Sequence, residues 1–140
     1  MNKSSWVRAL TALMVGCAAL LAAPAAAAAS PTAVHAPAKH RLHVQAAPEH
    51  DHVKAHEKTH IKGQMDVSDS ARTDSAEVLI VQQLVAGAWV NLTPGTCRPN
   101  GMFSIDVSFD VAATVSLRVY HPESSLYLES VSNVFALVVI

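Results

Sequence analysis

The sequence predicts an all-β fold: a small antiparallel β-sandwich of six or seven strands that follows a disordered N-terminal segment. The main observation is the alternation of apolar and polar residues from Phe103 to Asp110, which gives a strand one buried face and one solvated face. In addition, short apolar runs separated by Gly, Pro, Asn and Ser recur through residues 60–140. Residues 30–59, by contrast, contain almost no large apolar side chain to bury.

Residues 1–29 have the pattern of a secretory signal peptide. Lys3 and Arg8 precede an apolar stretch over residues 9–23, and an alanine run ending at Ala29 suits cleavage by a signal peptidase. The apolar stretch is shorter than the roughly 20 residues that a membrane-spanning helix needs, so we expect no transmembrane segment. Lipidation at Cys17 is disfavoured because the apolar stretch continues past it. The sequence therefore predicts a secreted, extracellular protein, with association with the cell surface left open.

Residues 30–59 are predicted to form a disordered tail rich in His, Ala and Pro. The segment has too few large apolar side chains to offset the conformational entropy lost on ordering. All but one of the eight histidines of the chain lie between residues 35 and 60. The folded domain is accordingly expected to occupy residues 60–140.

Turn residues divide residues 60–140 into strands. Gly87 marks a hairpin turn, and the pair Asn100 and Gly101 suits a turn that requires positive φ. A cluster of Pro and Gly over residues 94–101 predicts a loop. The expected strands, in order, are an edge strand over residues 61–65, the two arms of a hairpin over 78–84 and 89–92, two-faced strands over 103–109 and 115–120, a short segment at 127–128, and a final strand over 131–140.

The same residues resemble the immunoglobulin-like modules of secreted and surface proteins from high-GC Gram-positive bacteria, an actinobacterial type of module. The resemblance implies an immunoglobulin-like (Ig-like) β-sandwich that serves as a spacer or contact module and has no catalytic residues. It covers about residues 60–140 and lies in Ile61, Gly63 and Met65; Leu79, Val81 and Gln82; the run from Gly87 to Val90; the run from Asn100 to Phe103; and the run from Leu117 to Tyr120.

The histidines of the tail are candidate metal ligands. His52, His56 and His60 would share one face of a helix, and His50 with His52 offers a second close pair. Neutral imidazole suits Zn, Cu or Ni, so weak metal binding by His50, His52, His56 and His60 is one hypothesis. A soluble linker without a metal is the other, and it is the favoured one.

Residues 56–60 also spell H-E-x-x-H, the zinc-binding pattern of many metalloproteases. That pattern requires a helix buried in a catalytic domain, whereas a strand pattern begins here at Ile61. We therefore interpret the match as fortuitous and expect no enzymatic activity.

Cys97 is the single cysteine left after removal of residues 1–29, so no internal disulfide is expected. It lies in the predicted Pro and Gly loop and should therefore be exposed. An exposed thiol in an oxidising compartment predicts a fraction of dimers joined through Cys97. Four aromatic residues, Trp89, Phe103, Phe109 and Tyr127, are expected in the core.

The formal net charge of the chain argues against a nucleic-acid partner. Loss of Lys3 and Arg8 with the signal peptide changes the formal net charge from −1 to −3, which is no nucleic-acid footprint. The favoured function is therefore non-catalytic binding or surface interaction with a cell-envelope or extracellular protein or glycan. The alternative is an extracellular Zn, Cu or Ni binding protein that acts through the histidines.

Overall fold

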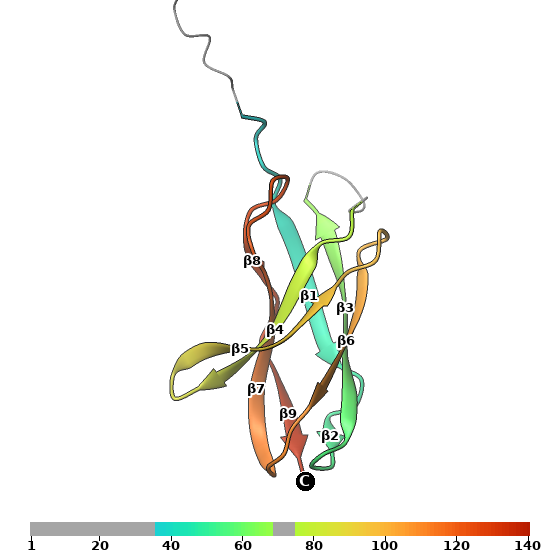
Figure 1. Cartoon of the computed structure of the whole chain (residues 1–140), viewed down its shortest axis with the longest axis vertical. Coiled ribbons are helices and arrows are strands. Elements are labelled where there is room, and N and C mark those ends of the chain that lie inside the picture. The colour runs from blue at the N-terminus through green and yellow to red at the C-terminus, as the bar shows by residue number, and fades with distance from the viewer. Residues whose placement is uncertain (1–35, 69–74) are drawn as a thin grey trace, which may run out of the picture. The chain divides into compact units, whose positions relative to one another are not determined.

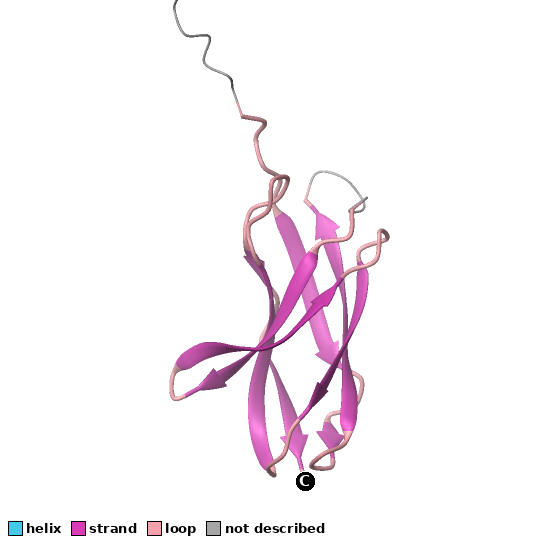
Figure 2. Ribbon diagram, in the orientation of Figure 1, coloured by secondary structure: helices cyan, strands magenta, loops and turns pink. Residues whose placement is uncertain are grey.

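A computed structural model describes residues 36–68 and 75–140, and in these residues all the regular structure is strand (Figure 2). Two sheets face each other, as Figure 1 shows, so the molecule is an all-β Ig-like sandwich, as predicted. The predicted signal peptide and the first residues of the predicted tail lie outside the described residues.

The described residues form nine strands. They are β1 (Leu42–Pro48), β2 (His52–Val53), β3 (Lys58–Val67), β4 (Val78–Val85), β5 (Ala88–Thr96), β6 (Met102–Ser108), β7 (Ala113–His121), β8 (Ser130–Val131) and β9 (Phe135–Val139).

The smaller sheet has the order β1-β3-β6, and both of its strand pairs are antiparallel. Its strands alternate between buried and exposed residues, most regularly in β1 and β6. Leu42, Val44 and Ala46 of β1 point inward, while His43 and Gln45 point outward. Each strand therefore contributes one face to the core and one to solvent.

The larger sheet has the order β2-β9-β7-β4-β5, with β8 paired to the end of β7. Its pairs are antiparallel except for β2 and β9, which run parallel. A two-residue turn at Ala86 and Gly87, both with positive φ, joins β4 to β5. Positive φ at both turn residues matches the twist of a tight hairpin.

The core lies between the inner faces of the two sheets. The most deeply buried apolar side chains come from β3, β4, β7 and β9, so both sheets contribute to one continuous cluster. These residues are Ile61, Met65, Leu79, Val81, Leu117, Val119 and Leu137.

The prediction that residues 30–59 are disordered is wrong from Leu42 onward. This part of the chain forms β1, β2 and the start of β3, and the strand count is nine rather than six or seven. The strand predicted over residues 61–65 belongs to β3, which lies between β1 and β6 and is not an edge strand. The side chains of β1 are small, but half of them face the core, and the backbone pairs fully with β3.

The predicted loop over residues 94–101 is only partly a loop. Pro94 and Gly95 belong to β5, which extends to Thr96 and includes a register shift opposite Val81 and Gln82. Pro94 is tolerated because β5 is the last strand of its sheet. Gly95 is required because a Cβ there would lie 2.6 Å from Ile105 Cγ1. The predicted turn at Asn100 and Gly101 is present, with a φ of 80° at Gly101.

In residues 36–68 and 75–140 no helix is long and apolar enough to cross a bilayer.

Candidate functional site

A trough with a volume of about 1000 Å³ crosses the outer face of the β1-β3-β6 sheet. It runs from Asn133, beside the outer edge of β1, to Arg98, beside β6. This volume lies within the range of small-ligand sites in proteins.

The strand register explains the shape and chemistry of the trough. Gln45 lies opposite Gln64, which lies opposite Met102; in the next row Ala47 lies opposite Lys62, which lies opposite Ser104. The small side chains of Ala47 and Ser104 leave space on either side of Lys62. The amides of Gln45 and Gln64 can both donate and accept hydrogen bonds. The trough therefore offers several neutral polar groups, the ammonium of Lys62 and, at its end, the guanidinium of Arg98.

The floor of the trough is held in place by Gly63. A Cβ at this position would lie 2.1 Å from the backbone oxygen of Gln45 and 2.3 Å from the ring of Phe103. Phe103 therefore packs across Gly63 from the inner side of the sheet, where its side chain is buried. Only glycine allows this approach without moving either β1 or the ring.

A cluster of charged side chains adjoins the trough at Lys62. Lys62 Nζ donates to Glu49 Oε1 at 2.6 Å, and His60 Nδ1 lies 2.6 Å from Asp106 Oδ1. The second oxygen of Glu49 lies 3.9 Å from His60 Nε2. The pKa of Glu49 is lowered below its ordinary value, and the largest cause is the hydrogen bond from Lys62. Electrostatic attraction to Lys62, His60 and His50 lowers the pKa further by smaller amounts.

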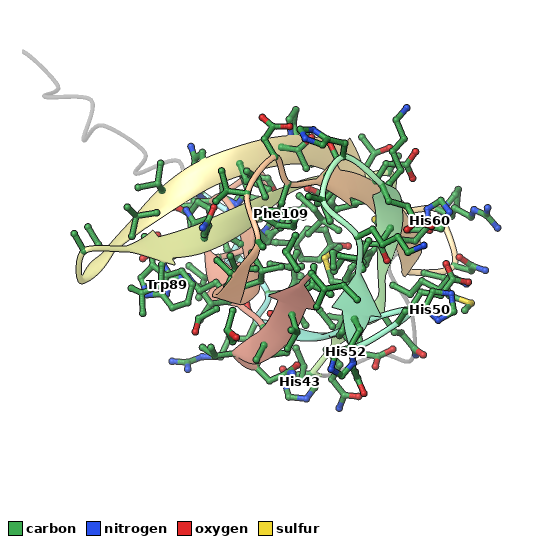
Figure 3. The ribbon with its side chains drawn as sticks, turned by 90° about the horizontal axis from the view of Figure 1, so that it is seen from below. His43, His50, His52, His60, Trp89 and Phe109 are labelled. Carbon is green, nitrogen blue, oxygen red and sulfur yellow. The ribbon has the colours of Figure 1, made fainter. Side chains whose placement is uncertain are left out.

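The histidines that the sequence offers as metal ligands do not share a helix. His52 is in β2, His60 is in β3, and His56 occupies a turn with a φ of 67°. His50 precedes β2, and Figure 3 shows the labelled histidines spread along the rim of the sandwich. Among the described residues no three His, Cys, Asp or Glu side chains are placed to hold one metal ion. The shared helical face considered for His52, His56 and His60 is absent, because His52 and His60 lie in strands and His56 in a turn between them. Metal binding by these histidines stays a prediction.

The prediction that Cys97 is exposed is also wrong, because its side chain is only 3% exposed. Glu77 N donates to Cys97 Sγ at 3.3 Å, and Sγ lies 3.6 Å from the backbone oxygen of Ser75. Cys97 directly follows β5, so it continues the strand and points inward instead of sitting in a solvated loop. A dimer joined through Cys97 stays a prediction, but the residues around Cys97 must first move to expose its thiol.

His121 is buried beside Glu77, the residue whose backbone N–H donates to Cys97. His121 Nε2 lies 3.2 Å from Glu77 Oε2, and the ring of Tyr127 meets the imidazole edge to face at 6.2 Å. His121 is 1% exposed, and its Nδ1 has no hydrogen-bond partner among the described residues. The arrangement fixes the end of β7 against the segment that precedes β4.

Three of the four aromatic residues expected in the core are buried, namely Phe103, Phe109 and Tyr127. Trp89 differs: it is a half-buried residue of the β4–β5 hairpin, on the outer face of the larger sheet (Figure 3). The guanidinium carbon of Arg118 lies 4.3 Å from the centre of the Trp89 ring. Trp89 is therefore part of a surface cation–π pair.

Sequence reasoning missed the trough because it missed β1. Without β1, the outward side chains of β3 have a neighbour on one side only, and no trough can be inferred. The available signal was the alternation of Leu42, Val44 and Ala46 with polar or small residues. Alanine weakened that signal because its side chain adds little hydrophobicity.

These observations define the class of protein: a β-sandwich module of the immunoglobulin-like type with a polar trough on its smaller sheet. No protein-family model and no curated protein matches the chain. Among solved structures, it is similar to the CARDB domain of a Pyrococcus furiosus protein in complex with di-metal ions. The TM-score is 0.49 and the sequence identity 11%, and the match covers 71% of this chain and 87% of that chain.

Proposed function

We propose that the protein is a secreted, non-catalytic binding module whose ligand occupies the trough on the β1-β3-β6 sheet. The observation that carries the proposal is the trough itself, with paired glutamines on adjacent strands and a volume suited to a few sugar rings. Rigid strands present these side chains, which suits recognition without a chemical step.

Within this proposal, a glycan of the cell envelope or extracellular matrix is the favoured ligand. Sugar hydroxyls both donate and accept hydrogen bonds, and the amides of Gln45 and Gln64 do the same. Gln64 Nε2 donates to Asp66 Oδ1 at 2.7 Å, which restrains the orientation of the amide. Met102 adds an apolar surface for the ring carbons of a sugar. An extracellular protein is the other class of ligand.

The test measures binding to a panel of cell-envelope and extracellular polysaccharides. The variant combines Gln45→Ala and Gln64→Ala, and Gln83→Ala, a glutamine outside the trough, is the control. Two lost hydrogen bonds at about 1 kcal/mol each predict a loss of affinity of roughly tenfold or more. If no polysaccharide binds, the assignment of a glycan as ligand fails, and if the control weakens binding equally, the assignment of the trough as the site fails. If the wild-type chain binds an envelope protein and the double variant does not, the ligand of the trough is a protein and not a glycan.

Transition-metal binding is the second candidate function, and the setting of His60 is the observation that favours it. Asp106 contacts His60 Nδ1 and thereby leaves Nε2 directed toward Glu49, which is how carboxylates orient metal-binding imidazoles. Calorimetric titration with Zn²⁺, Cu²⁺ or Ni²⁺ tests it. Binding that is lost in His60→Gln but kept in His43→Gln supports this candidate, and equal heats in all three proteins reject it.

A further inference from the structure

The hairpin formed by β4 and β5 extends beyond the region where the two sheets face each other (Figure 1). Its residues near the core, Leu79 and Val81, are fully buried. Val85 and Val90, on the same face further along the hairpin, are 47% and 49% exposed. This face, which includes Gln83, therefore continues past the edge of the sandwich, and no strand of the described residues covers it.

The outer face of the hairpin is held by a chain of polar contacts. Arg118 lies over the Trp89 ring, and its Nε donates to Gln82 Oε1 at 2.9 Å. Gln82 Nε2 in turn donates to Asn91 Oδ1 at 2.8 Å. These contacts join β7, β4 and β5, so the hairpin is fixed in its extended position and its uncovered face is a persistent surface.

The outer edge of β5 also has no partner strand within the described residues. β5 is the last strand of its sheet, and among the described residues no hydrogen bond reaches its outer edge. Because Val85 and Ala88 flank a two-residue turn, they form a hydrogen-bonded pair, and the backbone groups of the next residue, Trp89, point outward. An edge of this kind is a template for another strand.

The absence of charged residues around β4 and β5 indicates which strand would pair with the outer edge of β5. Between Val78 and Cys97 the chain has no Asp, Glu, Lys, Arg or His. A charged partner would gain no electrostatic complementarity here. A second copy, related by a two-fold axis, would place the same uncharged residues opposite each other without repulsion.

We propose that two copies of this chain pair antiparallel through β5 and form one sheet that continues across a two-fold axis. Val90 and Leu92 of each copy lie at the interface and cover each other's exposed apolar surface. The trough on the β1-β3-β6 sheet stays open in both copies, so the dimer presents two binding sites.

The test is sedimentation analysis of the purified chain over a range of concentrations, under reducing conditions so that Cys97 forms no disulfide. The wild-type chain is expected to show a reversible monomer–dimer equilibrium. In Val90→Lys, two like charges face each other at the interface, which predicts at least about a tenfold weaker association. Val131→Lys is the control, because Val131 is 48% exposed on β8, away from β5.

A monomer at every concentration, or equal weakening by the two lysine variants, would overturn the proposal. Circular dichroism shows whether each variant is folded. Should Val90→Lys fail to fold, hydrogen exchange of the wild-type chain decides instead. The outward amide of Trp89 becomes protected as concentration rises if β5 pairs, and its exchange stays constant if β5 does not.

Discussion

The outer edges of β1 and β5 differ in whether their backbone groups are capped by hydrogen bonds. Along β1, Asn133 accepts a hydrogen bond from Ala46 N at 3.0 Å and donates one to Ala46 O at 2.9 Å. Ser130 Oγ donates to Leu42 O, and Pro48, which lacks an N–H group, ends the strand. Along β5 no described residue provides such a cap.

The comparison shows that side chains of the segment around β8 take the place of a partner strand at the outer edge of β1. Asn133 reproduces the donor and acceptor of a peptide group, so the edge is satisfied without adding a strand. Proteins commonly protect sheet edges with charges, bulges or covering loops. β1 has such a cover, whereas β5 has a bulge and Pro94 but no charge.

The largest expected effect comes from Gly63→Ala. The added Cβ would overlap the Gln45 backbone and the Phe103 ring, so β1 must move away from β3. Overpacking of this kind should lower the free energy of unfolding by about 3 kcal/mol. Urea denaturation measures the loss. Gly87→Asn is the comparison: nothing lies within 4 Å of a Cβ there, so only the positive φ strains the new residue, and a smaller loss of about 1 kcal/mol is expected. Equal losses would contradict the close packing at Gly63.

Removal of the cap on β1 should have the next largest effect. Asn133→Ala deletes both hydrogen bonds to Ala46 and leaves its backbone groups unpaired, which should cost about 2 kcal/mol of unfolding free energy. Asn91→Ala, on the open edge, loses a single contact with Gln82 and should cost about 0.5 kcal/mol. The same denaturation experiment compares the two variants. A larger loss for Asn91→Ala would reverse our assignment of the protected edge.

The smallest expected effect is a pH dependence at Glu49. Because its pKa is lowered in the folded protein, Glu49 stabilises the fold above its unfolded value near 4.5, and this contribution is lost as pH falls through the folded pKa. Lys62→Met should move the pKa of Glu49 back toward its ordinary value. His60→Gln should move it less, because the Lys62 hydrogen bond is the largest cause. Titration of the Glu49 carboxyl by ¹³C NMR measures both, and an unchanged pKa in Lys62→Met would reject this cause.

The sequence predicted the parts of the fold in which large side chains alternate. The run from Phe103 to Phe109 and the run from Val115 to Tyr120 fall in or beside β6 and β7, and the hairpin at Gly87 is present. β1 was missed because its inward positions include Ala46, and its pairing with β3 depends on residues distant in sequence. The final apolar run was predicted as one strand but forms β8 and β9.

The candidate site was harder to predict than the fold. The histidine pattern suggested a metal site because spacing along a helix was assumed, and strand geometry separates those residues. The trough depends on which residues lie opposite each other on three strands, which spacing in the sequence does not specify. The open edge of β5 could have been suspected from its lack of charge, since the uncharged run from Val78 to Cys97 is visible in the sequence.

Hydrogen exchange of individual backbone amides in dilute solution tests the contrast between the two edges most directly. The amide of Ala46 donates to the Asn133 side chain and should exchange slowly, while the amide of Trp89 points to solvent and should exchange at close to the rate of an unstructured peptide. Slow exchange at Trp89 in the monomer, or fast exchange at Ala46, would contradict the account.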